Sequence, residues 1–252
     1  MMVYVALRVL GWLVLIVALM LVGPLFTYAF GGATMRGDWR MATHRVTGLA
    51  PDPAVHREAV VQAYASRTFG WRGAFAVHTW VAAKPANADR YTRYEVIGWY
   101  ARGGGSGLTI SNTRAPDAEW YGAAPTLIAD VRGSQAEAVI ARLPTAAAEY
   151  SVTSYSAWPG PNSNTFVAYL GRQIPEMRLT LPGTAIGKDY LPVGQWISRT
   201  PSGTGYQLSL GGVLGMSVAK DEGIEINLFG LVAGIDFRRP ALKLPGIGRV
   251  PA

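Results

Sequence analysis

The chain contains no cysteine and only three histidines, His44, His56 and His78. The absence of cysteine excludes disulfides, thiolate metal sites and a thiol nucleophile. No close grouping of histidines and carboxylates stands at the spacing of metal ligands, so we expect neither a metal ion nor another cofactor. A nucleophile in this chain must therefore be a side chain other than cysteine.

Charge is absent from one long stretch near the N-terminus. Val9 to Phe30 is uncharged and rich in Leu, Val and Ala, and its 22 residues are enough to cross a hydrocarbon core about 30 Å thick. A cleavable signal peptide is the alternative, with Arg8 as its basic region and Ala29-Phe30-Gly31 as a weak cleavage site. Because the apolar core of a signal peptide is usually only ~7–15 residues long, an uncleaved membrane anchor is favoured.

The orientation of this anchor is not set by simple charge counting. Arg8 precedes the segment, whereas Arg36, Arg40 and Arg45 follow it. Long domains, however, translocate largely regardless of such charges. We therefore expect a single-pass protein of the inner (cytoplasmic) membrane whose main domain is periplasmic or extracytoplasmic.

Basic residues exceed acidic ones, 23 to 16, which gives a net charge of +7. The Arg and Lys residues are spread along the chain instead of forming a stripe, which argues against nucleic acid as a partner. An anionic membrane surface is the favoured counterpart, so membrane lipid is the expected partner. The sequence identifies no protein partner.

Composition and the positions of glycine and proline divide the chain into four parts. Residues 1–30 form the anchor, and residues 31–53 a polar linker with Gly and Pro. Residues 54–190 are expected to form an α+β domain in which a small antiparallel sheet packs on helices. Residues 191–252 read as a β-rich extension, because short strand-like runs alternate there with Gly-containing turns.

Within these parts the apolar spacing predicts individual elements. A helix is expected over about 54–67 and another over 134–142, where Ser134 is followed three residues later by Glu137 in the pattern of a capping box. In the extension, strands are expected over 206–210, 213–219 and 224–229.

The most informative stretch is Trp158 to Val167. Pro159 and Pro161 fix their own φ and keep the preceding residues extended, so a helix cannot begin before Asn162. Asn162 or Ser163 is then a natural N-cap. Ser163 lies on the apolar face of the predicted helix, so its hydroxyl should point toward the protein, near backbone N–H groups that can stabilise a developing negative charge.

A histidine and a carboxylate stand on two consecutive predicted strands. His78 lies in the β-branched and aromatic run 74–81, and Glu95 in the run 91–99. The loop between them predicts an antiparallel hairpin, in which Glu95 could orient the imidazole of His78. A register slip of one residue would present Tyr94 in place of Glu95.

Asn162-Ser163-Asn164-Thr165-Phe166 resembles the motif Asn-Cys-x-x-Phe of circularly permuted papain-like enzymes, the group that includes lecithin:retinol acyltransferase and bacterial amidases. Their order of a strand histidine, a polar residue on the next strand and a nucleophile on a helix is also found here. The resemblance implies a permuted papain-like domain with Ser163 as nucleophile in place of Cys, His78 as general base and Glu95 holding the His tautomer.

The same resemblance implies an oxyanion and substrate region. Backbone N–H groups at the start of the Ser163 helix would form the oxyanion hole, and Asn162 or Asn164 could add a side-chain donor. Trp158 and Tyr94 are the aromatic side chains expected to contact the substrate, since aromatic residues suit a cleft that grips an extended or amphipathic ligand.

Four runs together resemble an uncharacterised bacterial family, the domain-of-unknown-function family numbered 3750. They are Gly70-Trp71-Arg72-Gly73, Val77-His78-Thr79-Trp80, the segment 93–99 and the segment 158–166. The likeness extends over most of the chain after the first helix, and it brings no known activity with it.

Two functional hypotheses follow. The first is a membrane-anchored hydrolase or acyltransferase of the cell envelope that acts on an amide or ester of peptidoglycan or lipid. The second is a catalytically inactive envelope protein that uses the same fold for binding or scaffolding, in which Ser163 only caps its helix.

Overall fold

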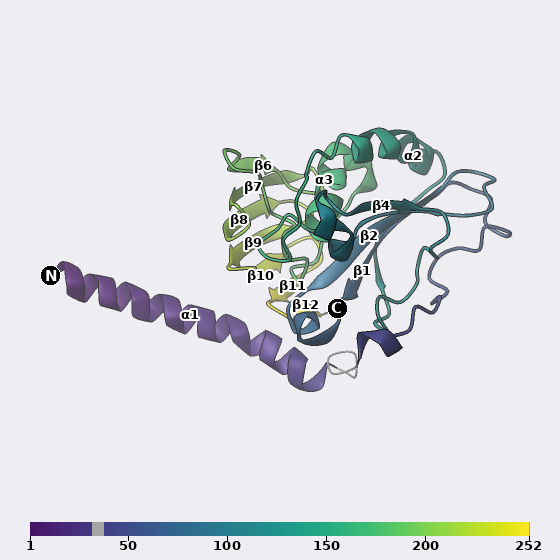
Figure 1. Ribbon diagram of the computed structural model, residues 1–252. Helices are drawn as coiled ribbons and strands as arrows, with labels where there is room; N and C mark the ends of the chain where they lie inside the picture. The colour runs from purple at the N-terminus through teal and green to yellow at the C-terminus, as the bar shows by residue number, and fades with distance from the viewer. Residues whose placement is uncertain (32–37, 252) are drawn as a thin grey trace.

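The computed structural model describes residues 1–31 and 38–251. The chain forms a long N-terminal helix, α1 (Met2–Phe30), and a body of two antiparallel sheets with two further helices, α2 (Gly133–Ala148) and α3 (Ser163–Gln173) (Figure 1). Four 3-10 turns, η2 to η5, cover Trp39–Met41, Gly70–Ala74, Gly98–Gly103 and Pro175–Met177. The mixed α+β class with an N-terminal apolar helix and antiparallel sheets is as the sequence predicts.

The first sheet has five strands in the order β4-β3-β2-β1-β5. Their bounds are β1 Val60–Arg67, β2 Val77–Lys84, β3 Thr92–Val96, β4 Leu108–Ser111 and β5 Thr126–Arg132. All neighbours pair antiparallel, and the predicted hairpin of the His78 and Glu95 strands is confirmed, with Val81 opposite Tyr94.

The helix predicted over 54–67 is wrong, because residues 60–67 form strand β1. This strand is hydrogen-bonded on both edges, and seven of its eight residues are buried. A strand buried on both faces carries apolar residues without strict alternation, as Val60, Val61, Ala63 and Tyr64 do here. Such a run matches helical spacing as well as strand spacing, so periodicity alone could not separate the two.

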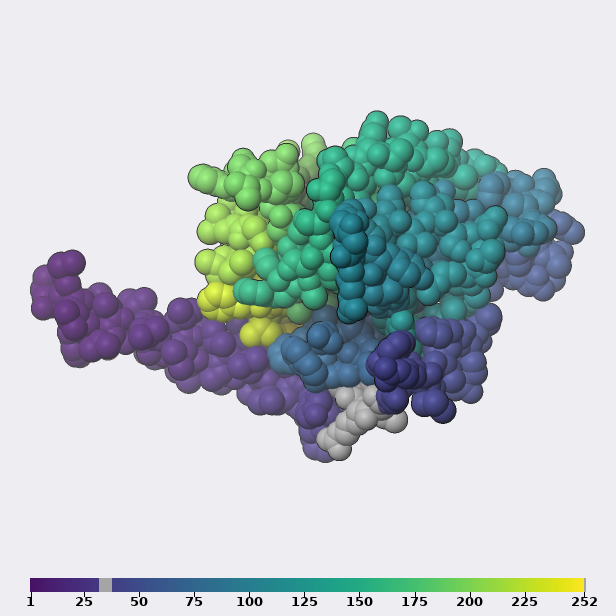
Figure 2. All heavy atoms as spheres, viewed as in Figure 1, coloured from purple at the N-terminus to yellow at the C-terminus, as the bar shows by residue number. Residues whose placement is uncertain are grey.

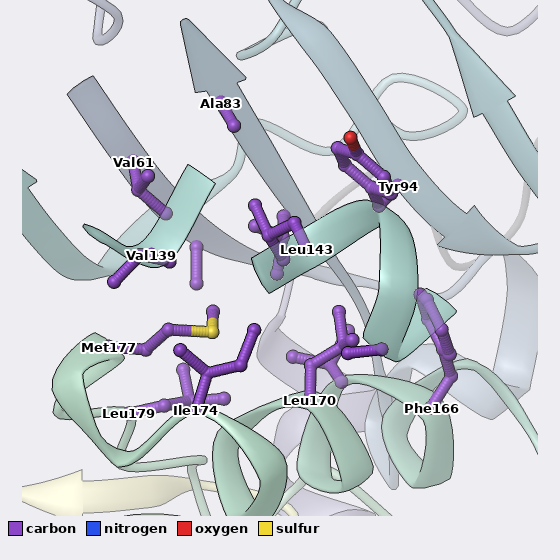
Figure 3. Close-up of a cluster of buried hydrophobic side chains, with 14 of the residues drawn as sticks. Val61, Ala83, Tyr94, Val139, Leu143, Phe166, Leu170, Ile174, Met177 and Leu179 are labelled. Carbon is purple, nitrogen blue, oxygen red and sulfur yellow. The ribbon is translucent and has the colours of Figure 1, made fainter. Parts of the chain in front are cut away.

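Both later helices pack on one face of the five-stranded sheet and close the main hydrophobic core (Figure 3). Phe166, Leu170 and Ile174 of the α3 segment meet Leu143 of α2 and Val61 of β1 there. The helix predicted over 134–142 is confirmed and extends to residue 148.

The capping box expected at the start of α2 is absent. The N-cap is Arg132, which makes no capping hydrogen bond through its side chain. The carboxylate of Glu137 instead accepts a hydrogen bond of 2.9 Å from the backbone N–H of Ala86, in the loop between β2 and β3. The Glu137 side chain therefore makes a tertiary contact in place of the helix cap that the local pattern predicts.

Leu170 provides a test of this core. Its side chain is fully buried between α2 and the sheet. Leu170→Ala should lower the free energy of unfolding by about 2–5 kcal/mol, because the lost transfer energy adds to the cost of a cavity. Chemical denaturation followed by tryptophan fluorescence measures the change. An effect below about 1 kcal/mol would mean that this site is not tightly packed.

The second sheet is a seven-stranded meander in the order β12-β11-β10-β9-β8-β7-β6. Its bounds are β6 Ile197–Arg199, β7 Gly205–Leu210, β8 Leu214–Ala219, β9 Gly223–Leu228, β10 Leu231–Asp236, β11 Ala241–Leu244 and β12 Gly248–Val250. The three strands predicted in this region are confirmed within a residue or two. The expected hairpin turn at 220–223 connects β8 to β9.

A buried ion network attaches this sheet to the rest of the body. The carboxylate of Glu225 on β9 accepts from Lys188 Nζ at 2.6 Å and from Lys243 Nζ at 2.5 Å. All three side chains are buried. Lys188 precedes the sheet in the chain and Lys243 lies on β11, so the single carboxylate joins two strands to the preceding segment.

The end of α1 is folded onto the body. Gly23 and Pro24 are buried, and a Cβ at Gly23 would collide with the backbone carbonyl of Pro245 in the β11–β12 turn. Thr27 Oγ1 donates to the carbonyl of Gly246 at 3.2 Å, and Arg67 Nη1 at the end of β1 donates to the same oxygen at 2.6 Å. The helix, the first sheet and the second sheet therefore meet at one turn.

Candidate active site

The start of α3 is built by a side-chain cap. Asn162 Oδ1 accepts from the backbone N–H groups of Asn164 and Thr165, and Thr165 Oγ1 accepts in return from the N–H of Asn162. The helix begins at Ser163, as the two prolines before it predict. Asn162, not Ser163, is the cap, so the Ser163 hydroxyl is not used for capping.

This cap leaves one backbone donor at the helix start. The N–H groups of Asn164 and Thr165 point to Asn162 Oδ1, and that of Phe166 points to the Asn162 carbonyl. In the described part of the chain, no acceptor pairs with the N–H of Ser163. The first turn of a helix favours negative charge, so this N–H can receive an anionic oxygen beside the Ser163 hydroxyl.

Asn164 fastens this helix start to the strand that carries His78. Its Nδ2 donates to the carbonyl of Val77 at 3.0 Å and to that of Ile186 at 2.8 Å, and its Oδ1 accepts from Thr79 Oγ1 at 2.9 Å. Val77 and Thr79 flank His78 in β2. Asn164 therefore fixes Ser163 relative to the histidine strand.

Neither asparagine retains a side-chain N–H for an oxyanion. The Nδ2 group of Asn162 donates to the carbonyls of Ala157 and Ile186 at 3.2 and 3.0 Å, and that of Asn164 is occupied as described. An amide NH2 group has two donors, and in both residues two carbonyls take them. The expected side-chain oxyanion donors are positioning residues in this structure, and the backbone N–H of Ser163 is the remaining candidate.

His78 and Glu95 form the predicted pair. His78 Nε2 lies 3.0 Å from Glu95 Oε2, and both side chains are buried. Tyr94 faces the opposite side of β3 and lies in the core beside Leu143 (Figure 3). The register thus selects Glu95 over Tyr94 as the partner of His78, and Tyr94 does not border the cleft described below.

Two arginines hold Glu95 in its ionised form. Arg93 Nη2 is 2.8 Å from Glu95 Oε2, and Arg114 Nη1 is 2.6 Å from Oε1. Burial alone would raise the pKa of Glu95, but the hydrogen bond from His78 and the charges of Arg93 and Arg114 outweigh it and lower the pKa to about 2. The carboxylate is therefore an acceptor only, and His78 Nε2 must be the donor.

His78 is held as a neutral base. Burial lowers its pKa, and Glu95 offsets this only in part, because Arg93 and Arg114 act against the imidazolium. The ring is stacked on Trp120, with centroids 3.7 Å apart and an interplanar angle of 17°. With Nε2 bound to Glu95, the neutral ring carries its free electron pair on Nδ1, which can accept a proton.

Ser163 and His78 line the same cleft, whose volume is about 1120 Å³. Trp158 lines it too, and its Nε1 donates to the carbonyl of Phe229 at 3.0 Å. Val17 and Leu21 of α1 form part of the wall. Among the described residues, no hydrogen bond joins the Ser163 hydroxyl to the imidazole, so the two groups share a cleft without forming a closed pair.

Two partners of this site lay outside the sequence prediction. Arg114 comes from the segment after β4, and Trp120 from the segment before β5. Their contacts with Glu95 and His78 depend on how the sheet folds, so no local pattern could identify them. Arg93, two residues before Glu95 and therefore on the same face of the strand, is the one member that strand periodicity indicates.

The cleft thus combines a helix-start hydroxyl with a histidine oriented by a carboxylate, which are the groups that serine-type acyl transfer requires. The chain belongs to the family described as "Protein of unknown function (DUF3750)", whose model matches residues 58–190, just over half of the chain. The matched region contains His78, Glu95 and Ser163. No curated protein and no solved structure matches the chain. The papain-like resemblance remains a hypothesis.

Proposed function

We propose that this protein is a membrane-anchored hydrolase or acyltransferase of the bacterial cell envelope, with Ser163 as nucleophile and His78 as general base. The observation that carries the proposal is the His78–Glu95 bond of 3.0 Å, in a cleft that Ser163 also borders. This bond leaves Nδ1 as the basic atom. The order of histidine strand, carboxylate strand and nucleophile helix is that of permuted papain-like enzymes.

The proposed reaction forms a covalent intermediate. The Ser163 oxygen attacks the carbonyl carbon of an amide or ester while its proton passes to His78 Nδ1. The backbone N–H of Ser163 stabilises the negative carbonyl oxygen. The carbon–leaving group bond then breaks, and His78 returns the proton to the departing amine or alcohol. Water completes a hydrolysis, or a second amine or alcohol completes an acyl transfer.

The cleft must close before this reaction can begin, because the hydroxyl and the imidazole are not hydrogen-bonded in the structure. Catalytic hydrogen bonds are often long in the absence of substrate and tighten when it binds. The substrate class is an amide or ester of peptidoglycan or lipid. The contribution of Val17 and Leu21 to the wall favours a substrate that carries an acyl chain. The proposed location is the inner membrane, with the body on the periplasmic side.

The second candidate is a binding or scaffold protein without catalysis. Two observations favour it, namely the absence of a Ser163–His78 hydrogen bond among the described residues and a serine where permuted papain-like enzymes carry cysteine. A hydroxyl is not ionised near neutral pH, whereas a thiol partly is, so serine depends entirely on a well-placed base. In this candidate the cleft would hold an apolar ligand without breaking a bond.

A fluorophosphonate probe distinguishes the two candidates, because it labels only an activated serine. We expect the detergent-solubilised full chain to be labelled, and the label to be lost in Ser163→Ala and in His78→Gln. Ser134→Ala is the matched control, since Ser134 also lies in the first turn of a helix but is exposed and does not line the cleft. Labelling that persists in Ser163→Ala, or that never exceeds its background, would support the binding candidate.

A further inference from the structure

The seven-stranded sheet has its apolar side on the outside. Along β7, β8 and β9, apolar side chains alternate outward with polar side chains facing the body. The outward set includes Tyr206, Leu208, Met216, Val218 and Ile226, each between 45% and 58% exposed. We call these five residues and their neighbours on the same side of the sheet the outer face.

The inward side of the same strands is polar. Gln207, Ser209, Glu225 and Asn227 are buried. The side chains of Gln207 and Asn227 donate to Asp189 in the segment before the sheet, and Glu225 pairs with Lys188 of that segment. A sheet with one wet face normally turns its apolar side toward the core. Here the arrangement is reversed, and no described residue covers the outer face. A contiguous apolar surface of this kind marks an interaction site.

The position of α1 indicates what covers the outer face. The helix contacts β10 and the β11–β12 turn, and it leaves the body on the side where this sheet lies (Figures 1 and 2). An apolar helix of this length and composition fits a bilayer. The sheet is therefore held beside the point at which the chain would enter the membrane.

The length of α1 places the body in contact with lipid if the helix spans the bilayer. From Val17 onward the helix has a half-buried or buried side against the body, through Leu21, Pro24 and Thr27. The part free of the body, residues 2–16, is only about 22 Å long at about 1.5 Å per residue. A hydrocarbon core is about 30 Å thick. If α1 spans it, the adjoining part of the body must reach the lipid.

The rim of the sheet carries charge that suits anionic headgroups. The turns at one end of the strands contain Lys220, Arg238 and Arg239, all exposed, and Arg238 pairs there with Asp221. At another border of the sheet, Trp196 is 64% exposed. Basic and aromatic side chains around an apolar surface are typical of proteins that rest in the membrane interface.

We propose that the outer face of the seven-stranded sheet rests on the hydrocarbon boundary of an anionic bilayer, with the basic turns among the headgroups. The chain is then attached twice, by α1 and by this sheet. The proposal is independent of any catalytic activity, because none of the five defining residues borders the cleft.

The absence of cysteine makes the test direct. The full chain carrying Met216→Cys is labelled with an environment-sensitive fluorophore and reconstituted into vesicles of phosphatidylethanolamine and phosphatidylglycerol. Glu149→Cys, at the exposed end of α2, is the matched control. We expect blue-shifted emission at position 216 that is quenched by doxyl-labelled lipid and protected from aqueous iodide, with the opposite behaviour at position 149.

Two results would overturn the proposal. Equal iodide quenching at both positions would show that the outer face is in water. Blue-shifted emission at position 216 without lipid quenching, together with disulfide-linked dimers of unlabelled Met216→Cys, would show that a second copy of the chain covers it. Ile226→Cys on β9 repeats the measurement on the neighbouring strand, so that a local disturbance at one site does not decide the outcome.

Discussion

Glu95→Gln is expected to lower the free energy of unfolding by about 3 kcal/mol at pH 7. The fall in the pKa of this carboxyl from 4.5 to about 2 on folding corresponds to that amount. The substitution removes a buried negative charge and leaves Arg93, itself buried, without its partner. Breaking a buried ion pair on one side costs several kcal/mol, because the remaining charge is no longer compensated.

The pH dependence of stability should change in the same variant. A carboxyl whose pKa is lowered on folding stabilises the protein above its unfolded pKa, and this contribution is lost as the pH falls from 4.5 toward 2. His78 acts in the same direction at higher pH, because its lowered pKa makes folding less favourable as the pH falls below 6.5. Glu95→Gln should therefore flatten the stability profile below pH 4.5.

Chemical denaturation of the detergent-solubilised chain between pH 3 and 8 measures both effects. Glu176→Gln is the matched control, because its partner Arg142 is exposed and such pairs contribute only about 0–1 kcal/mol. Equal losses in the two variants would contradict the role given to the Glu95 network. If fluorophosphonate labelling occurs, it should weaken in Glu95→Gln, since the orientation of His78 is no longer fixed.

A comparably large effect is expected at the other buried carboxylate. Glu225→Gln leaves Lys188 and Lys243 buried side by side without a negative charge, at distances that had been 2.6 and 2.5 Å from its oxygens. We expect a loss of about 3–5 kcal/mol. Since Lys188 belongs to the segment before the second sheet, the loss should include detachment of that sheet from the body.

The decisive comparison replaces the whole network. In the triple variant Glu225→Leu, Lys188→Met, Lys243→Met the three paired charges are removed together, and apolar replacements of a buried ion group are often neutral or stabilising. The triple variant should therefore be more stable than Glu225→Gln alone, as measured by thermal unfolding with circular dichroism. If the single variant retained wild-type stability, the network would not hold the sheet in place.

Prolines and loop residues predicted more of the site than the hydrophobic pattern did. Pro159 and Pro161 restrict the chain so strongly that the start of α3 followed from the sequence, and the short loop after β2 fixed the hairpin that pairs His78 with Glu95. The helix expected over 54–67 was wrong because β1 is buried on both faces. Its burial results from neighbours that are distant in the chain, and the sequence gives no local sign of them.

The electrostatic environment of the site was also beyond local patterns. Arg114 reaches Glu95 across a separation of 19 residues, and Trp120 reaches His78 from a separate segment. The side of the second sheet that faces the body was likewise not predictable from the local sequence. Glu225 and Asn227 alternate with Ile224 and Ile226 as in any amphipathic strand, and only the folded chain reveals which side faces inward.

The packing of Gly23 and Pro24 against the β11–β12 turn fixes the end of α1 to the body. A body on a flexible linker can move through a wide volume, whereas a body packed against its own helix stays at a constant height above the membrane that the helix would enter. The opening of the cleft would then lie at a fixed distance from the point where α1 enters the bilayer. If α1 spans a bilayer, the cleft would reach molecules in the layer next to that bilayer, and molecules farther out would have to be brought to the cleft.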